Sequence, residues 1–398
     1  MARTMTAGCF NAVALAALIA VAAATRSGSV NGERAPGQAP TLRITSPAPD
    51  TIVSGTTKIE AEIQPPASVR TMTATVNGLL VCTIEQPPFA CTWDAGSVPR
   101  SHHVRVVATL SDGRRVVGGV RTKDLRYVES VRTEAVLVPV LVTDDGRFVS
   151  GLKQQDFQLF EDGVAQPLAS MVSEEAPLDL VVAIDVSGSM EGELDEVKPA
   201  VKRLLSKLRP GDAATVLGFN DTTFVAAERE KNPQAREDAV ELLTSWGGTA
   251  LYDATITALG LVSREFERKG VVIFSDGDDQ HSVTRREDAM ARVHASDAML
   301  YTIGFGRGAT VPYLRSSLES YARSTGGRAF FPGEVKNLDS VFKQIVTELA
   351  NQYVLSYSST ALKQDGKWRN IKVRVGKGNY DVRARRGYYA SGRRQAER

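Results

Sequence analysis

The sequence predicts a multidomain protein in which a doubly wound α/β domain, with a mostly parallel sheet, is inserted in a small β-sandwich and preceded by an N-terminal β-sandwich. Residues 41–125 form short runs that alternate apolar and polar side chains, with turn residues between or after them. Residues 178–349 alternate apolar strands with segments of helical period, which indicates a parallel sheet covered on both faces. Residues 126–177 and 350–391 return to period two, and each has too few strands to form a stable domain alone.

Length and charge limit the class of protein. A chain of 398 residues suggests about two to three domains at ~150 residues each. Lys and Arg number 48 and Asp and Glu number 46, giving a net charge of +2, so no basic footprint for nucleic acid is expected. The short basic end, residues 392–398, is expected to be a disordered tail in solvent.

The N-terminus predicts export. Residues 1–24 have a positive residue, Arg3, then the apolar run Ala12–Ala24, which ends in small residues suited to cleavage of a signal peptide. This run is shorter than the ~20 apolar residues of a membrane-spanning helix. An uncleaved anchor is the alternative, and no membrane span is expected after cleavage. Residues 25–40 are rich in Gly, Ser and Pro and predict a flexible linker.

Two cysteines in the first β domain predict a disulfide. Cys82 and Cys91 flank a turn at Gln86-Pro87-Pro88, so we expect a hairpin disulfide in an oxidising compartment. A zinc site is the alternative, but two cysteines without nearby histidines are too few ligands. The domain resembles bacterial immunoglobulin-like modules in three motifs: Val76-Asn77-Gly78, Pro87-Pro88-Phe89 and Thr92-Trp93-Asp94.

The segments on either side of the α/β domain are expected to pair with each other. Val136 and Val138 begin an alternating apolar face in the first segment, and Ile371 and Val373 begin one in the second. Pairing would cover both faces and would bring the start and end of the α/β domain together. Pro139 cannot donate a ladder hydrogen bond, which predicts that its strand lies at a sheet edge.

Polar clusters follow or face the strands of the predicted parallel sheet. Asp185–Met190 follows the strand Leu178–Ile184, and Ser275–Asp278 follows Val271–Phe274, while Gly247–Thr249 precedes a helix. Ligands of open α/β sheets bind outside the carboxyl ends of the strands. Carboxylates and hydroxyls are hard donors suited to Mg²⁺ or Mn²⁺, and the absence of His and Cys disfavours zinc. Helix capping by these Ser, Thr and Asp residues is the alternative.

These motifs resemble the metal-ion-dependent adhesion site of the von Willebrand factor type A domain, which is a Rossmann-like fold. The matching positions are Asp185, Ser187, Ser189, Thr249 and Asp276. The resemblance implies that a protein partner supplies an Asp or Glu to the bound cation, and that a shape change is coupled to the last helix. The wider chain resembles a bacterial group of secreted type A domain proteins, on the motifs Gln155-Asp156-Phe157, Glu161-Asp162-Gly163, Trp368-Arg369 and Arg386-Gly387-Tyr388.

Three nearby acids and one glycine-rich segment are given other roles. Asp253 is expected to brace its loop, and Asp278 and Asp279 are expected to be solvated surface acids. Residues 304–309 partly resemble a dinucleotide fingerprint, but their late position predicts a plain loop.

The function predicted is that of a binding module and not of an enzyme. No general base is evident, because none of the four histidines lies in a candidate motif. We therefore expect an extracytoplasmic protein-binding or adhesion module, secreted or in a bacterial periplasm or envelope. An envelope scaffold or assembly factor with a structural metal is the alternative.

Overall fold

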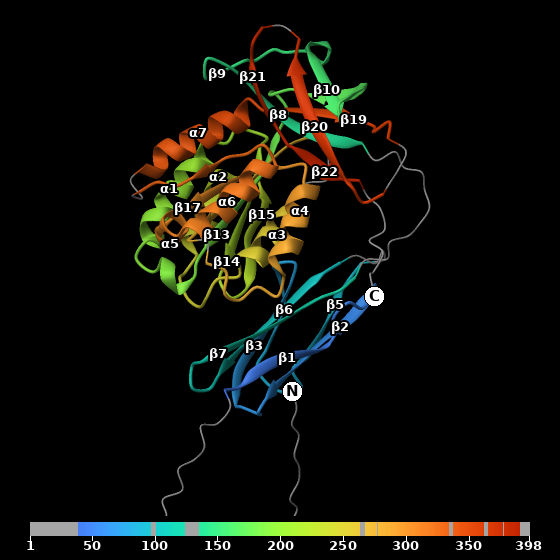
Figure 1. The fold of residues 1–398 in the computed structure, drawn as a ribbon. Helices are drawn as coiled ribbons and strands as arrows, with labels where there is room; N and C mark the ends of the chain where they lie inside the picture. The colour runs from blue at the N-terminus through green and yellow to red at the C-terminus, as the bar shows by residue number, and fades with distance from the viewer. Residues whose placement is uncertain are drawn as a thin grey trace, which may run out of the picture. The chain divides into compact units, whose positions relative to one another are not determined.

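The computed structural model describes residues 39–96, 101–123, 135–262, 267–276, 278–333, 337–361, 365–376 and 378–390 (Figure 1). The predicted signal peptide at 1–24, all but the last two residues of the predicted linker and the predicted tail at 392–398 lie outside the described residues. Among the residues described, no helix combines the length and apolar character needed to cross a membrane.

The N-terminal domain is an antiparallel β-sandwich. One sheet has the order β1-β2-β5 and the other the order β4-β3-β6-β7. The strands are β1 (Thr41–Ser46), β2 (Thr56–Gln64), β3 (Val69–Val76), β4 (Leu79–Ile84), β5 (Ala90–Asp94), β6 (His103–Leu110) and β7 (Arg115–Arg121). Alternate residues of both sheets meet in one apolar core, in which Val104, Val106 and Ala108 of β6 are at most 1% exposed.

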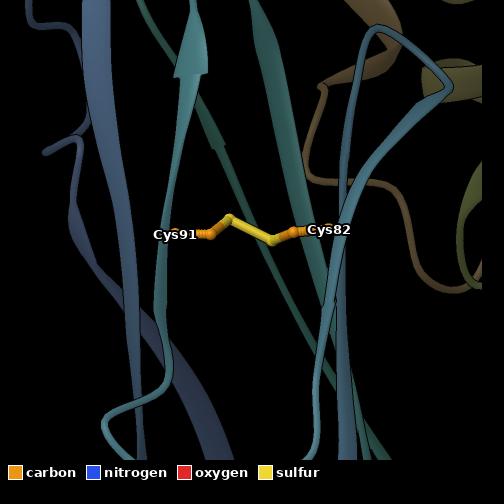
Figure 2. Close-up of a disulfide and its surroundings, with 2 residues drawn as sticks. All are labelled: Cys82 and Cys91. Carbon is orange, nitrogen blue, oxygen red and sulfur yellow. A yellow bond between two sulfur atoms is a disulfide. The ribbon is translucent and has the colours of Figure 1, made fainter.

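A disulfide between Cys82 and Cys91 joins the two sheets of this sandwich. Figure 2 shows the bond running from one strand to another. The Cα atoms of the two cysteines are 6.7 Å apart. The predicted pairing is confirmed, but the expectation of a hairpin disulfide is wrong. Cys82 lies in β4 and Cys91 in β5, and these strands belong to different sheets. The turn at Pro87-Pro88 therefore carries the chain across the sandwich.

The second β-sandwich is built from two segments far apart in the chain. Its sheets have the orders β12-β19-β8-β21, with β9 beside β8, and β11-β10-β20-β22. The strands before the α/β domain are β8 (Val136–Asp144), β9 (Arg147–Phe148), β10 (Phe157–Glu161), β11 (Val164–Gln166) and β12 (Leu168–Val172). The strands after it are β19 (Tyr353–Tyr357), β20 (Trp368–Val375), β21 (Asp381–Ala384) and β22 (Gly387–Tyr389), and one helical turn, η1 (Gln154–Asp156), precedes β10.

Strand pairing brings the two ends of the α/β domain together. Val172, the last residue of β12, lies opposite Val354 of β19. The predicted insertion of the α/β domain in a small sandwich is therefore confirmed, while the domain boundaries stay a prediction. Buried polar contacts join the same two segments, since the Glu161 carboxylate accepts hydrogen bonds from the hydroxyls of Tyr357 (2.6 Å), Tyr388 (2.9 Å) and Ser359 (2.5 Å).

The prediction that the strand containing Pro139 lies at a sheet edge is wrong. This strand, β8, lies between β19 and β21. Pro139 is opposite Val354 of β19, but the pairing with β21 covers only Val140–Thr143. At Pro139 the β21 side of the strand is thus locally an edge, where a residue without an N–H is tolerated.

The α/β domain has a six-stranded sheet in the order β15-β14-β13-β16-β17-β18. All neighbours pair in parallel except β15, which is antiparallel to β14. The strands are β13 (Leu178–Asp185), β14 (Ala213–Phe219), β15 (Thr223–Glu230), β16 (Arg268–Ser275), β17 (Met299–Gly304) and β18 (Ala329–Phe330). The helical elements are η2 (Gly188–Met190), α1 (Leu194–Ser206), α2 (Pro233–Glu241), α3 (Leu251–Leu261), α4 (Arg286–Ala295), α5 (Gly306–Thr310), α6 (Pro312–Ser324) and α7 (Leu338–Ala350).

Helices cover both faces of this sheet, as Figure 1 shows. Apolar side chains of α1, α2 and α7 pack on one face, and those of α3, α4 and α6 pack on the other. The central strand β13 is buried along its whole length, which explains its almost uninterrupted apolar sequence. Asp185 is the last residue of this strand. The fold therefore places a buried carboxylate at the carboxyl end of the central strand.

The inserted architecture predicts that the second sandwich depends on the C-terminal strands. A chain that ends at Ala350 loses β19, the strand between β12 and β8. Residues 136–172 should then become sensitive to limited proteolysis, because an open sheet without its middle strand is not stable. A chain that lacks only residues 391–398 is the control and should keep them protected. Protection of 136–172 in the shorter chain would contradict this architecture.

The disulfide predicts a measurable loss of stability on reduction. Thiol labelling of the exported protein should find Cys82 and Cys91 blocked until a reductant is added. Reduction should lower the free energy of unfolding by about 2.5–3 kcal/mol, the chain-entropy value for a loop of ~10 residues. The double variant Cys82→Ala/Cys91→Ala should show no such response. Two reactive thiols in the folded, unreduced protein would rule the pairing out.

Candidate metal centre

Two of the three polar loops begin at the carboxyl ends of neighbouring parallel strands, and we call this side of the sheet its carboxyl edge. β13 and β16 pair in parallel up to Ile184 and Phe274. The next residues, Asp185 and Ser275, are in contact, since the Ser275 hydroxyl donates a 2.7 Å hydrogen bond to Asp185 Oδ2. Asp276 follows Ser275 directly, so both predicted carboxylates lie at this edge.

The first loop folds back on Asp185. The backbone N–H of Ser187 donates to Asp185 Oδ1 at 3.0 Å, and the hydroxyls of Ser187 and Ser189 are 3.0 Å apart. The chain then enters the single turn η2. Asp185 and Ser187 are at most 1% exposed, whereas Ser189 is exposed. The three donors predicted for this loop are therefore close together, and Ser189 is the one that faces solvent.

Backbone hydrogen bonds fix the second loop against the first. The N–H of Gly188 donates to the Gly247 carbonyl at 2.8 Å, and the N–H of Trp246 donates to the Val186 carbonyl at 2.9 Å. Thr249 lies just beyond these contacts and is 3% exposed. The fold thus brings Thr249 to the same edge through the backbone of its neighbours.

Two residues after β14 hold the second loop from its other side, and sequence reasoning missed them. The Asp221 carboxylate accepts the N–H of Gly248 at 2.7 Å, and the Asn220 carbonyl accepts the N–H of Ala250 at 2.7 Å. The signal that could have found them is position, because they follow a parallel strand at its carboxyl end. Ser275, which donates to Asp185, belongs to the third predicted polar cluster but was given no role of its own.

The third loop packs tightly against a glycine. A Cβ atom added to Gly308 would lie 2.5 Å from the carbonyl oxygen of Asp276, so only glycine fits there. Gly308 belongs to the short helix α5, which spans Gly306–Thr310. The expectation of a plain loop at 304–309 is therefore wrong. This helix supports the backbone of Asp276, which is 7% exposed.

The three further acids differ from one another. Asp253 is fully buried and accepts the N–H groups of Val283 (2.9 Å) and Thr284 (3.0 Å), so it braces the segment before α4. Asp279 is half-buried and accepts hydrogen bonds from the N–H of Tyr252 and the hydroxyl of Ser282. It is therefore a second brace and not the solvated acid that was expected. Asp278 forms an ion pair with Arg307 at 3.0 Å.

Burial makes the charge of Asp185 costly. Burial, together with the negative charge of Asp276, raises the pKa of Asp185 to about 7, against the lowering effect of the hydrogen bonds from Ser187 and Ser275. No Lys, Arg or His in the described part of the chain forms an ion pair with Asp185. A divalent cation beside Asp185 and Asp276 would supply the missing positive charge.

The donor set fits a hard cation better than zinc. Carboxylate oxygens of two residues and hydroxyl oxygens of three are the ligand types that Mg²⁺ and Mn²⁺ prefer. The described residues contain no group of three His, Cys, Asp or Glu side chains placed to hold a metal, so a site at this edge depends on the hydroxyls.

Comparisons with known families agree with the fold. Residues 179–344 match the von Willebrand factor type A domain, and residues 40–106 match the bacterial Ig domain. No curated protein matches the chain. The α/β domain therefore has the von Willebrand factor type A fold and the N-terminal sandwich has a bacterial immunoglobulin-like fold, as the sequence predicted.

Solved structures resemble the chain at low identity. One is von Willebrand factor type A from Catenulispora acidiphila, with 11% identity, 82% of this chain and 74% of that chain covered, and a TM-score of 0.39. Another is the vWF domain of the type V pili tip protein Mfa5 from Porphyromonas gingivalis, with 13% identity, coverages of 44% and 95%, and a TM-score of 0.39. A third is proximal thread matrix protein 1 from the mussel byssus with a zinc-occupied MIDAS motif, with 19% identity, coverages of 48% and 49%, and a TM-score of 0.41. The chain spans about half the length of the mussel protein.

The candidate site predicts loss of cation binding on removal of one carboxylate. Calorimetry on the purified protein should detect Mg²⁺ or Mn²⁺ binding, and Asp185→Ala should abolish it. Asp238→Ala, which removes an exposed carboxylate of α2 in the same domain, is the matched control and should bind normally. Unchanged binding by Asp185→Ala would refute the assignment.

The raised pKa of Asp185 predicts opposite pH effects on stability and on binding. A carboxyl whose pKa is about 7 in the folded chain and about 3.9 in the unfolded chain stabilises the metal-free fold while protonated, and this contribution is lost as pH rises from about 4 to 7. In the absence of metal, the urea midpoint should therefore fall between about pH 4 and 7, and Asp185→Asn should flatten that fall. Mg²⁺ must displace the proton, so its affinity should weaken by about tenfold per unit below pH 7. A pH-independent affinity would contradict the shift.

Proposed function

We propose that this chain is an extracytoplasmic protein-binding or adhesion module that recognises a partner carboxylate through a divalent cation. The cation would be held by Asp185, Ser187, Ser189, Thr249 and Asp276. The observation that carries the proposal is the fully buried Asp185 carboxylate, at an edge where three loops offer oxygen donors and no described cationic side chain pairs with it.

The exposure of the donors supports binding of an external ligand. Asp185, Ser187 and Thr249 are buried, whereas Gly188 and Ser189 are exposed. Solvent, and hence a partner, can reach the donor set from the side of η2. A cation held largely by neutral hydroxyls would keep net positive charge at that side, which a carboxylate of a partner could neutralise.

The positions of the histidines favour binding over catalysis. A hydrolase that used Ser187 or Ser189 would need a base within hydrogen-bond reach. His102 and His103 lie in the first β domain, His294 lies on α4, and His281 is 3.4 Å from Asp221. Among the described residues, the hydroxyls of Ser187 and Ser189 hydrogen-bond each other and no histidine, so we propose that the chain is not an enzyme.

Two features support a location outside the cytoplasm. Residues 1–24 have the composition of a signal peptide, and the disulfide between Cys82 and Cys91 is of a kind that persists in oxidising compartments. We therefore propose secretion, or residence in a bacterial periplasm or envelope.

The test uses the full chain as bait in extracts of the native cell envelope. Capture is compared in Mg²⁺ and in EDTA, with wild-type, Asp185→Ala and Asp238→Ala baits. We expect a protein that is captured by wild type and Asp238→Ala in Mg²⁺, and is lost with chelator and with Asp185→Ala. Substitution of one Asp or Glu of that protein should then abolish capture.

The other outcome favours a scaffold with a structural metal. In that case EDTA and Asp185→Ala would lower the melting temperature while the same proteins were still captured. Such a result would overturn recognition through the cation.

A further inference from the structure

The outer face of β6 in the immunoglobulin-like domain carries basic side chains that are nevertheless buried. Along β6, Val104, Val106 and Ala108 point into the core of the sandwich. His103 and Arg105 alternate with them and so lie on the outer face of the sheet. Yet Arg105 is only 2% exposed and His103 only 6%. A buried guanidinium requires a partner, because an unpaired buried charge is costly.

The partner is a carboxylate of the α/β domain. Arg105 Nη1 lies 2.8 Å from Oδ2 of Asp253, and Arg105 Nη2 donates to the His281 carbonyl at 3.3 Å. His103 Nε2 is 3.6 Å from the same carboxylate oxygen. Burial lowers the pKa of His103 to about 4, so at neutral pH the positive charge beside Asp253 is that of Arg105.

Asp253 passes this contact to the loops of the candidate metal centre. It lies in the first turn of α3, which begins two residues after Thr249. Its carboxylate binds the N–H groups of Val283 and Thr284, which connect the third loop to α4. Through its ion pair with Asp253, Arg105 is therefore connected to the segments that follow the second and third donor loops.

A second group of contacts reaches the first loop. The Arg115 guanidinium lies 3.6 Å from the ring centroid of Trp246. The backbone N–H of Trp246 donates a hydrogen bond to the carbonyl of Val186, which lies between Asp185 and Ser187. Arg121 donates to the Thr284 hydroxyl at 3.0 Å. This face of the sheet thus contacts Trp246, Asp253 and Thr284, and each of these residues lies next to, or is hydrogen-bonded to, one of the three donor loops.

The backbones also approach closely. A Cβ atom on Gly119 of β7 would lie 2.5 Å from a methyl carbon of Val283, and the N–H of Val225 donates to the Gly78 carbonyl at 2.9 Å. Close packing of glycine against a side chain, together with an inter-domain backbone hydrogen bond, indicates a complementary surface and not a loose encounter.

We propose that the outer face of sheet β4-β3-β6-β7 docks on the α/β domain, and that Arg105 is a positioning residue of the metal centre. This inference rests on the proposed function, since it assigns Arg105 a role toward the cation. Mg²⁺ demands near-ideal octahedral geometry, so the order of the donor loops sets its affinity. Through Asp253, Arg105 holds residues 283–284 and the start of α3 in one arrangement.

The test compares full-length variants by two independent measurements. Hydrogen exchange of the amides of Val283 and Thr284, in EDTA, reports docking without any metal. Calorimetric titration with Mg²⁺ reports the centre. Arg105→Ala removes the ion pair, and Arg105→Lys keeps a charge. Arg115→Ala trims the same face at an exposed position and serves as the variant least able to disturb folding. Arg114→Ala, at the exposed turn residue paired with Asp112, is the matched control.

We expect faster exchange of both amides in Arg105→Ala and Mg²⁺ affinity weaker by roughly tenfold or more, a typical coupling between sites. Arg105→Lys should restore part of both effects, Arg115→Ala should give smaller changes of the same sign, and Arg114→Ala should match wild type. Equal exchange and equal Mg²⁺ affinity in all variants would overturn the inference. If the wild type binds no Mg²⁺, the proposed function fails, while a change of exchange in Arg105→Ala would still establish the docking.

Discussion

The candidate site depends on one constraint, the burial of Asp185 at the carboxyl end of the central strand. A carboxylate there cannot be solvated, and the hydrogen bonds that it accepts from Ser187 and Ser275 do not balance its charge. Hydrogen bonds hold the neighbouring loops in place around Asp185: the N–H of Gly188 donates to the Gly247 carbonyl, and the N–H of Gly248 donates to the Asp221 carboxylate. The backbone of the centre is thus held by protein contacts, which is the preorganisation that a binding site for a small hard cation requires.

Insertion of the α/β domain gives its last helix a fixed attachment. Glu348, in the final turn of α7, is 1% exposed and pairs with Arg383 of β21 and, at 3.5 Å, with Arg328. At the same end, the Arg268 guanidinium donates to the carbonyl of Leu349 at 2.6 Å. The α/β domain is therefore joined to the second sandwich by paired strands at β12 and β19 and also by the ion pair of the buried Glu348 carboxylate with the partly exposed Arg383. Loss of Arg383 would leave a buried carboxylate with one partner fewer, so this attachment contributes to the stability of both domains.

Sequence periodicity predicted the elements whose burial is complete and failed where burial is partial or contacts are distant. The strand at 178–184 was evident, because a strand that is buried on both faces is almost wholly apolar. The strand β15 and the helix α4 were missed, since β15 is an edge strand of mostly half-buried residues and α4 buries only Ala289 and Val293. All five predicted donors lie at one edge because loop position follows from strand order. No local pattern could indicate the pairing of Arg105 with Asp253, which are 148 residues apart.

Two buried carboxylates of the α/β domain show how charge can be balanced in this fold. Asp185 and Asp253 are both fully buried; Asp185 accepts the backbone N–H of Ser187 and the hydroxyl of Ser275, and Asp253 accepts the backbone N–H groups of Val283 and Thr284. Asp253 also receives the guanidinium of Arg105 from another domain, whereas no described Lys, Arg or His pairs with Asp185. If Asp185 were only a loop brace, a partner like that of Asp253 or an exposed position would be expected, because an isolated buried charge is not retained cheaply. The hydroxyls of Ser187 and Ser189 beside it provide neutral oxygens and no positive charge. This difference between two carboxylates in one domain is the physical argument for an external cation at Asp185.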